Sequence, residues 1–260
     1  DQIDPGRVER DIVQEECDRW PGWARSRPAR NPAFEQRLRA EWDTADWVVV
    51  NSEWSKQALV EQGVAEEKIR VVPLAYSPPD ESILMEEASL PLQVLWLGTV
   101  NLRKGIPYLV QSARNLEGAP IEFNVVGPID ITDAAVARAP SNMEFVGRVP
   151  RGEVASWYRN ADVFVLPTLS DGFAITQLEA MAQGLPVIAT PRCGNVVTDG
   201  EDGELVPPRD EEALTATFSE LIDAPGRLKA MSRRARETAQ TFTLDRVAEN
   251  LIEVVSDQQV

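Results

Sequence analysis

Four charged side chains stand where this chain could hold a ligand that carries phosphate. Asp171 and Glu179 lie eight positions apart in SDGFAITQLEAMAQGLPVIAT, and Arg103 and Lys104 are the adjacent basic pair in GTVNLRKG. A helix that starts after a glycine-containing loop offers unpaired N–H groups and the positive end of its dipole to an anion. The basic pair would neutralise phosphates, and the two acids would contact hydroxyl groups. These residues therefore predict an elongated ligand with phosphate between hydroxyl-bearing ends.

The segment around the two acids is predicted to form a strand, a loop, a helix and a second strand. ADVFVLP and LPVIAT are short apolar runs typical of buried strands, and residues 174–183 favour a helix that ends at Gly184. If this helix begins near Phe173, Glu179 lies roughly 9 Å further along its axis. The two acids would then contact opposite ends of one ligand.

Strands and helices alternate through most of the chain. Apolar strands are predicted at LQVLWLG, IEFNVVG, MEFVG and GELVPP, and helices near 106–116, 152–160, 211–222, 226–240 and 244–255. This alternation predicts an α/β fold, a doubly wound, Rossmann-like parallel sheet covered by helices on both faces. Ligands of such sheets bind beyond the carboxyl ends of the strands, which is where the loops at 98–105, 147–149 and 170–173 would lie.

The beginning of the chain has a different character. Residues 1–40 are charged and interrupted by prolines, so we expect irregular structure in which Trp20 and Trp23 face a missing partner domain. A short strand at 47–50, a helix capped by Ser52 and a strand in KIRVVPLAY are predicted to follow.

Composition narrows the classes of function. The 260 residues are 43% hydrophobic, enough for one large domain or a domain and a half with a proper core. A net charge of -16 argues against nucleic acid and anionic membranes as general partners. Since the chain has no histidine, it cannot supply a Ser/His/Asp triad or a histidine-dependent zinc site. No GxGxxG follows a strand, which disfavours an NAD-dependent enzyme.

The cysteines and the lengths of the apolar runs indicate where the protein is located in the cell. Cys17 and Cys193 are far apart and give no disulfide framework, and no apolar run has the length of a membrane span or a signal peptide. We therefore expect a cytoplasmic protein, and peripheral attachment to a membrane through a missing part stays open.

Several motifs together resemble the family 4 glycosyltransferases of the GT-B fold, over about residues 47–255. They are NSEWSKQALVEQGVAEEKIRVVPLAY, the strand followed by RKG, MEFVGRVPRGEVASWYRNADVFVLPTLSDGFAITQLEAMAQGLPVIAT, and DGEDGELVPP. Members of this family have two Rossmann-like domains with the active site in the cleft between them. The resemblance implies that residues 1–75 are the tail of a largely missing amino-terminal, acceptor-side domain. Residues 76–242 would be the nucleotide-sugar-binding domain and 243–260 a carboxyl-terminal helix that crosses back to the first domain.

The resemblance also implies roles for individual residues. The family's signature is two acids separated by seven residues, which here are Asp171 and Glu179. Asp171 would be the catalytic acid that orients the transferred sugar, Glu179 would hold the ribose, and Lys104 would bind the diphosphate, with Arg103 beside it. The other substrate-binding residues implied are Gly98, Thr99, Gly147, Arg148, Val149, Gly172, and, through their backbone N–H groups, Phe173, Ala174, Ile175 and Thr176. The loop 147–149 would meet the base.

Four positions depart from the family's pattern. Thr99 stands where arginine is common, Asp171 is one methylene shorter than the usual glutamate, Ala174 replaces glycine, and Asn195 replaces an acid. The shorter acid should reach the sugar differently, and Ala174 leaves less room for a close approach of the ligand.

The activity implied is that of a hexosyltransferase-type glycosyltransferase, whose donor-binding part is present here. It would transfer a sugar from a nucleoside-diphosphate sugar to an acceptor (a glycan, a lipid or a small molecule), with retention of anomeric configuration and without a metal or other cofactor. The alternative is a nucleotide or nucleotide-sugar binding module without catalytic activity, either because the chain is a fragment or because Asp171 and Thr99 mark lost activity.

Overall fold

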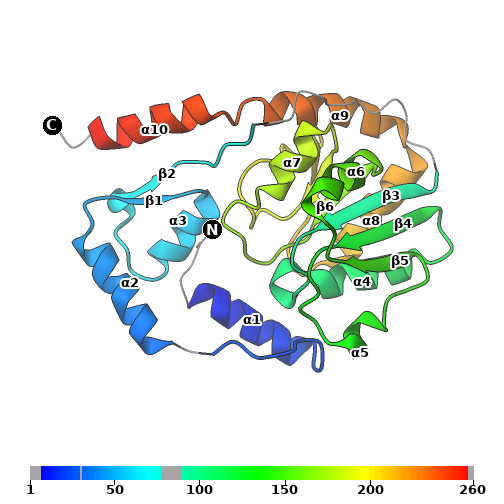
Figure 1. Cartoon of the computed structure of the whole chain (residues 1–260), viewed down its shortest axis with the longest axis horizontal. Coiled ribbons are helices and arrows are strands. Elements are labelled where there is room, and N and C mark those ends of the chain that lie inside the picture. Colours follow the sequence, from blue (N-terminus) through cyan, green and yellow to red (C-terminus); the bar gives the residue numbers. More distant parts are fainter. Residues whose placement is uncertain (1–6, 30, 78–89, 257–260) are drawn as a thin grey trace.

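The computed structural model describes residues 7–29, 31–77 and 90–256. Figure 1 shows a large unit built on a parallel sheet, a smaller unit around β1 and β2, and the last helix, α10, extending from the large unit across the smaller one. The predicted segments 1–75, 76–242 and 243–260 extend outside the described residues at 1–6, 30, 78–89 and 257–260, and the boundaries between them stay predictions.

Six parallel strands form the main sheet in the order β5-β4-β3-β6-β7-β8. The chain starts in the middle of the sheet at β3, moves outward to β5, and returns on the other side of β3 at β6. The strand order thus reverses between β3 and β6, and in open parallel sheets ligands bind outside the carboxyl ends of the strands at such a point. The predicted doubly wound sheet is confirmed. Its strands are β3 (Leu92–Leu97), β4 (Ile121–Val126), β5 (Met143–Gly147), β6 (Val163–Leu166), β7 (Val187–Ala189) and β8 (Gly203–Leu205).

Two apolar layers cover the faces of this sheet. Successive side chains of a strand point to opposite faces, so in β3 Trp96 joins one core and Leu95 the other. The layer on the Trp96 side contains α4 (Ile106–Asn115) and α8 (Glu211–Asp223), where the rings of Phe123 and Phe218 lie 5.1 Å apart. The other layer contains α6 (Val154–Arg159), α7 (Thr176–Ala182) and α9 (Gly226–Ala239). A short helix, α5 (Asp133–Val136), follows β4.

The beginning of the chain belongs to the large unit. Helix α1 (Val8–Arg19) lies against it, and Cys17 and Trp23 are part of the same core as β3 and β4. Trp23 is only 1% exposed, and the ring of Trp20 packs edge-on against Tyr108 at 5.5 Å. The prediction that this segment is irregular and that both tryptophans face a missing domain is therefore wrong. The prediction overlooked a narrow apolar stripe along α1, which lies among the charged residues and is sufficient to dock this helix on the large unit.

The smaller unit has two parallel strands, β1 (Val48–Val50) and β2 (Ile69–Val71), joined by α3 (Glu53–Val60) and preceded by α2 (Pro32–Thr44). The predicted cap is confirmed, since Ser52 Oγ accepts a hydrogen bond from the Ser55 N–H at 3.1 Å. Helix α10 (Leu244–Ser256) leaves Leu244, Ile252 and Val255 about two thirds exposed. Among the helices of the described residues, none combines the length and the apolar character needed to cross a membrane.

Candidate functional site

The loops after β3 and β6 meet at the point where the strand order reverses. The Leu169 N–H donates to the carbonyl oxygen of Arg103 at 2.8 Å, which ties one loop to the other. Gly105 permits the close approach, because its φ is +71° and a Cβ at this position would lie 1.8 Å from the carbonyl oxygen of Pro167. The two loops that carry the predicted basic pair and the first acid are therefore held against each other.

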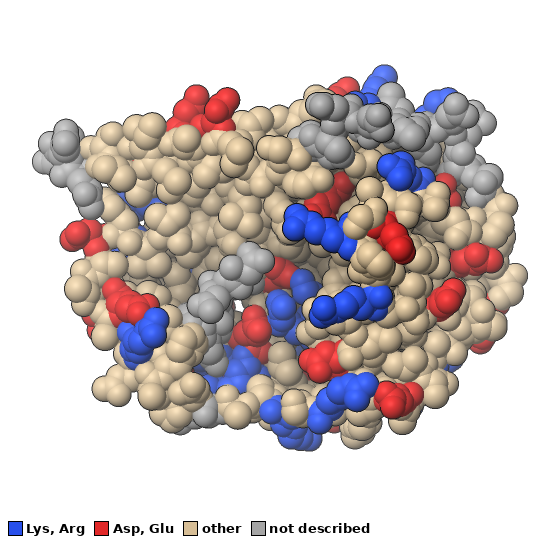
Figure 2. All heavy atoms as spheres, in the orientation of Figure 1, with Lys and Arg blue, Asp and Glu red and all other residues tan. Residues whose placement is uncertain are grey.

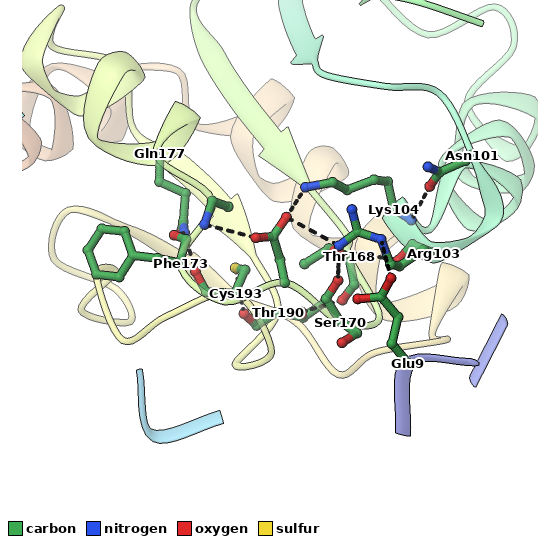
Figure 3. Close-up of polar contacts among 12 residues, drawn as sticks. Glu9, Asn101, Arg103, Lys104, Thr168, Ser170, Phe173, Gln177, Thr190 and Cys193 are labelled. Carbon is green, nitrogen blue, oxygen red and sulfur yellow. Dashed lines mark hydrogen bonds and ion pairs between the residues drawn. The ribbon is translucent and has the colours of Figure 1, made fainter. Parts of the chain in front are cut away.

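The side chains of Lys104 and Arg103 converge on the carboxylate of Asp171. Figure 3 shows both basic side chains, with Glu9 beside Arg103. Lys104 Nζ forms an ion pair with Asp171 Oδ2, and a terminal guanidinium nitrogen of Arg103 lies 3.7 Å from the same oxygen. Arg103 also donates to the carbonyl of Ser170 at 2.7 Å, and its Nε lies 3.5 Å from Oε1 of Glu9 on α1. The Asp171 side chain is only 8% exposed, so this is an enclosed cluster rather than a surface ion pair.

A backbone donor completes the surroundings of this carboxylate. The Ala174 N–H donates to Asp171 Oδ1 at 3.1 Å. Asp171 thus fixes the turn that leads into α7, in the way that an acidic residue caps a helix. One carboxylate is enclosed by two cations and an amide, the set of donors that an anionic ligand would require.

Helix α7 begins at Thr176, not near Phe173. Ala174 has a φ of 49°, in the left-handed region, so the preceding turn is not part of the helix. Glu179 consequently lies three residues, roughly 4.5 Å, from the start of the helix. The predicted separation along the helix, based on an earlier start, is wrong.

Burial controls the protonation of the groups around this cluster. Burial, followed by the neighbouring Arg103, lowers the pKa of Lys104 to about 8. The Asp171 carboxylate favours the ammonium form and so acts in the opposite direction. Burial raises the pKa of Cys193 to about 12, so its thiol stays protonated and donates to the carbonyl of Thr190 at 3.1 Å.

Glu179 has different neighbours. The hydroxyl of Tyr158 on α6 donates to Glu179 Oε2 at 2.8 Å, and Tyr158 is only 3% exposed. Burial raises the pKa of Tyr158 well above its usual range, and Glu179 adds to the effect. Burial also raises the pKa of Tyr76, again with a contribution from Glu179. The second acid is therefore half-buried beside two protonated tyrosines.

The remaining predicted residues lie at the same edge of the sheet. The Gly98 N–H donates to the Val126 carbonyl at 3.0 Å and the Gly127 N–H to the Gly147 carbonyl at 2.8 Å, so the ends of β3, β4 and β5 are side by side. Thr99 and Arg148 are exposed on this edge. Val149, Ile175 and Thr176 are half-buried, and Gly172, Phe173 and Ala174 are buried. Direct contacts join Arg103, Lys104, Asp171 and Ala174, whereas Glu179 contacts Tyr158 instead.

Sequence reasoning missed several residues that hold the loop 168–171. Trp54 Nε1 on α3 donates to Ser170 Oγ at 3.2 Å, and the Arg192 guanidinium lies 4.8 Å from the centre of the Trp54 ring. The smaller unit therefore contacts the loop that carries Asp171. No pattern in the sequence indicated Trp54 or Glu9, because both come from elements distant in the chain. Figure 2 shows acidic and basic side chains gathered around a hollow between the two units.

Comparison with known proteins gives a consistent match. The profile of a family described as "Glycosyl transferases group 1" matches residues 91–224, just over half of the chain. The amylovoran biosynthesis glycosyltransferase AmsK of Erwinia amylovora is 27% identical over 199 residues, which are 70% of this chain and 49% of that protein. The chain thus spans about half the length of this relative.

Solved structures share the fold. A sucrose-phosphate synthase from Thermosynechococcus elongatus aligns with a TM-score of 0.70 at 23% identity, over 95% of this chain and 66% of that one. The Anabaena protein Alr3699/HepE, solved in complex with UDP and glucose, aligns with a TM-score of 0.69 at 17% identity, over 86% of this chain and 67% of that one.

Proposed function

Because the chain belongs to the glycosyl transferases group 1 family, we propose that it supplies the donor-binding part of an enzyme that transfers a sugar from a nucleoside diphosphate to an acceptor. The observation that carries this proposal is the convergence of Lys104, Arg103 and the Ala174 N–H at the point where the strand order reverses. A binding site at this point suits a diphosphate, because it has two cations and a backbone N–H in the turn before a helix. The relative solved with UDP and glucose supports a nucleotide sugar as the donor.

The chemistry follows from the charges at this edge. As the sugar leaves, negative charge develops on the oxygens of the departing nucleoside diphosphate, and Lys104 and Arg103 would stabilise it electrostatically. We infer that these cations make a metal unnecessary. Glu179, oriented by the Tyr158 hydroxyl, would accept hydrogen bonds from the ribose, and the half-buried loop around Gly147 and Val149 would meet the base.

Three further features are proposed on the basis of the family resemblance. We propose that the sugar is a hexose, that its anomeric configuration is retained, and that the protein works in the cytoplasm. The two cysteines are free and buried, which supports a reducing location, and attachment to a membrane surface stays open.

We also propose that an amino-terminal domain completes the enzyme. A parallel sheet of only two strands, β1 and β2, cannot bury both of its faces, and parallel sheets normally have both faces covered. On the same side of the molecule, α10 exposes Leu251, Ile252 and Val255. These apolar surfaces support a position against further residues of an acceptor-side domain.

Titration calorimetry of this chain with UDP-, GDP- and ADP-glucose tests the proposal. We expect saturable heat with at least one of them, and no heat with any would contradict it. The alternative of a binding module is decided with a longer chain that includes the amino-terminal domain. Sugar transfer by that protein supports the enzyme, whereas donor binding without transfer to any acceptor supports the module.

A further inference from the structure

We propose that Asp171 is an internal anion that engages the phosphate-binding cations and competes with the donor diphosphate for them. This inference rests on the proposed function, because it concerns the same cations. It differs from the role in sugar orientation that the family resemblance implies for this residue. That role predicts no change in UDP affinity when Asp171 is replaced by a neutral residue, whereas competition predicts a gain.

The first step is the direction of the Asp171 side chain. Its Oδ2 contacts Lys104 Nζ and lies 3.7 Å from Arg103, and its Oδ1 accepts the Ala174 N–H at 3.1 Å. Both oxygens are thus engaged by the donors that would otherwise receive a phosphate. Since the side chain is only 8% exposed, it is directed into this cluster and not toward the surface.

The second step is the length of the side chain. An aspartate at this position places its carboxylate close to its own backbone, and here that backbone is fixed by the Asp171 N–H, which donates to the Arg192 carbonyl at 2.9 Å. A carboxylate so close to a fixed loop reaches the cations that lie beside the loop. A glutamate would extend one methylene further from the same anchor.

The third step is electrostatic. A diphosphate entering this site must either displace the Asp171 carboxylate from Lys104 and Arg103 or share them with it, and a like charge at such short range opposes an anion. The second carboxylate of the cluster, that of Glu9, lies 3.5 Å from Arg103 Nε, whereas Asp171 approaches a terminal nitrogen of the same guanidinium group. Asp171 is therefore the group that links both cations.

The test is a pair of neutral substitutions that keep the turn intact. Asp171→Asn and Asp171→Ser both retain an oxygen that can accept the Ala174 N–H, so they remove the charge and keep the cap. Calorimetry with UDP and with uridine separates the phosphate contribution from that of the nucleoside. The matched control is Asp223→Asn, which removes the same charge from an exposed position at the end of α8.

We expect both neutral variants to bind UDP about tenfold more tightly than the wild type and to bind uridine unchanged, because only the phosphates meet Asp171. The control variant should bind both ligands as the wild type does. In a Lys104→Ala background, the gain for UDP should fall to about twofold or less, because the competition acts mainly through that ammonium.

Two results would overturn the inference. Weaker binding of UDP by the folded Asn or Ser variant would show that Asp171 holds the cations in place for the ligand, and unchanged binding would show that it does not compete with the ligand. An equal gain for uridine would show that the effect does not act through the phosphates. Failure of the wild type to bind UDP, GDP or ADP would be a different outcome, because it contradicts the proposed function itself.

Discussion

At the residue scale, the proposed binding of a diphosphate depends most on the charge of Lys104. Lys104 is 13% exposed, lies beside Arg103, and has its pKa lowered to about 8 by burial and by that neighbour. Asp171 and an incoming diphosphate both stabilise its ammonium form. Affinity at this site is therefore linked to pH within the range of ordinary assays.

The linkage predicts a loss of affinity in mild alkali. Below about pH 8 Lys104 carries its proton and attracts the diphosphate. Above about pH 8 Lys104 of the free protein is mostly neutral, so it must take up a proton before it can attract the diphosphate. We expect the affinity for UDP to fall about tenfold between pH 7 and pH 9, while the phosphate itself, with a second pKa near 6, does not titrate. Calorimetry at several pH values measures this. Lys104→Arg, which keeps its charge, is the control and should show a flat profile, and an equal fall in both proteins would argue against Lys104.

Glu179 should act on the nucleoside rather than on the phosphates. The Tyr158 hydroxyl holds its carboxylate at the first turn of α7, apart from the Lys104 cluster. Glu179→Gln should weaken UDP and uridine by a similar factor, about tenfold, because both contain the ribose that would donate to the carboxylate. Tyr158→Phe, which removes only the orienting hydroxyl, should give a smaller loss for both ligands. A loss confined to UDP would place Glu179 at the phosphates instead.

At the scale of elements, the start of α4 sets the distance between the loop that carries Arg103 and Lys104 and the loop that carries Asp171. Gly105 lies against the end of β6, where no side chain fits. This contact explains why the 3₁₀ turn at 102–104, capped by Asn101, can bring its basic pair to the loop after β6.

A matched pair of glycine substitutions tests this contact. Gly105→Ala should destabilise the protein by roughly 3 kcal/mol, since it combines a φ of +71° with a Cβ 1.8 Å from the Pro167 carbonyl oxygen. Gly118→Ala has a similar φ of +86° but no atom within 4 Å, and should cost about 1 kcal/mol. Urea unfolding measures both. Equal losses would show that backbone conformation, not the close approach, makes glycine necessary at position 105.

Helix α1 and the residues that follow it are the second part of the fold for which we predict an effect on stability. Trp23 follows this helix and its side chain is buried in the core of the large unit, so Trp23→Ala should destabilise that unit by about 3 to 5 kcal/mol. Trp47→Ala, in the smaller unit where the half-buried ring lies under Arg70, should cost much less. Chemical unfolding followed by circular dichroism compares the two. A neutral Trp23→Ala would mean that the segment that follows the first helix does not contribute to this core.

Prediction from the sequence succeeded where local pattern and burial agree. The strands at 92–97 and 163–166 are buried on both faces, so they have continuous apolar runs, and the parallel sheet follows from their alternation with helices. The start of α7 was misplaced because alanine is a good helix former, whereas Ala174 is held in a left-handed turn by its hydrogen bond to Asp171. Helix propensity reflects the type of residue and takes no account of this hydrogen bond. The contacts of Glu9 and Trp54 depend on tertiary packing and have no signal in their own segments.

At the scale of the whole molecule, the site is a locally basic point on an acidic protein. The net charge of -16 repels a diphosphate at a distance, and Lys104 and Arg103 act only at close range. The hollow in Figure 2 lies between the large unit and the smaller one, and the indole of Trp54 links the smaller unit to the loop of Asp171. The large unit thus provides the wall of this hollow that carries the Asp171 loop, and the smaller unit contacts that loop through Trp54.

The central claim is that this wall binds a nucleoside diphosphate through Lys104. The most direct test is the affinity of Lys104→Ala for UDP and for uridine, or for the base that the wild type prefers, measured by calorimetry at pH 7. We predict that the variant loses about a hundredfold in affinity for the diphosphate and no more than about twofold for the nucleoside, since a charge-assisted contact to phosphate is lost. Equal losses for both ligands would mean that Lys104 supports the structure of the loop, and would contradict the account.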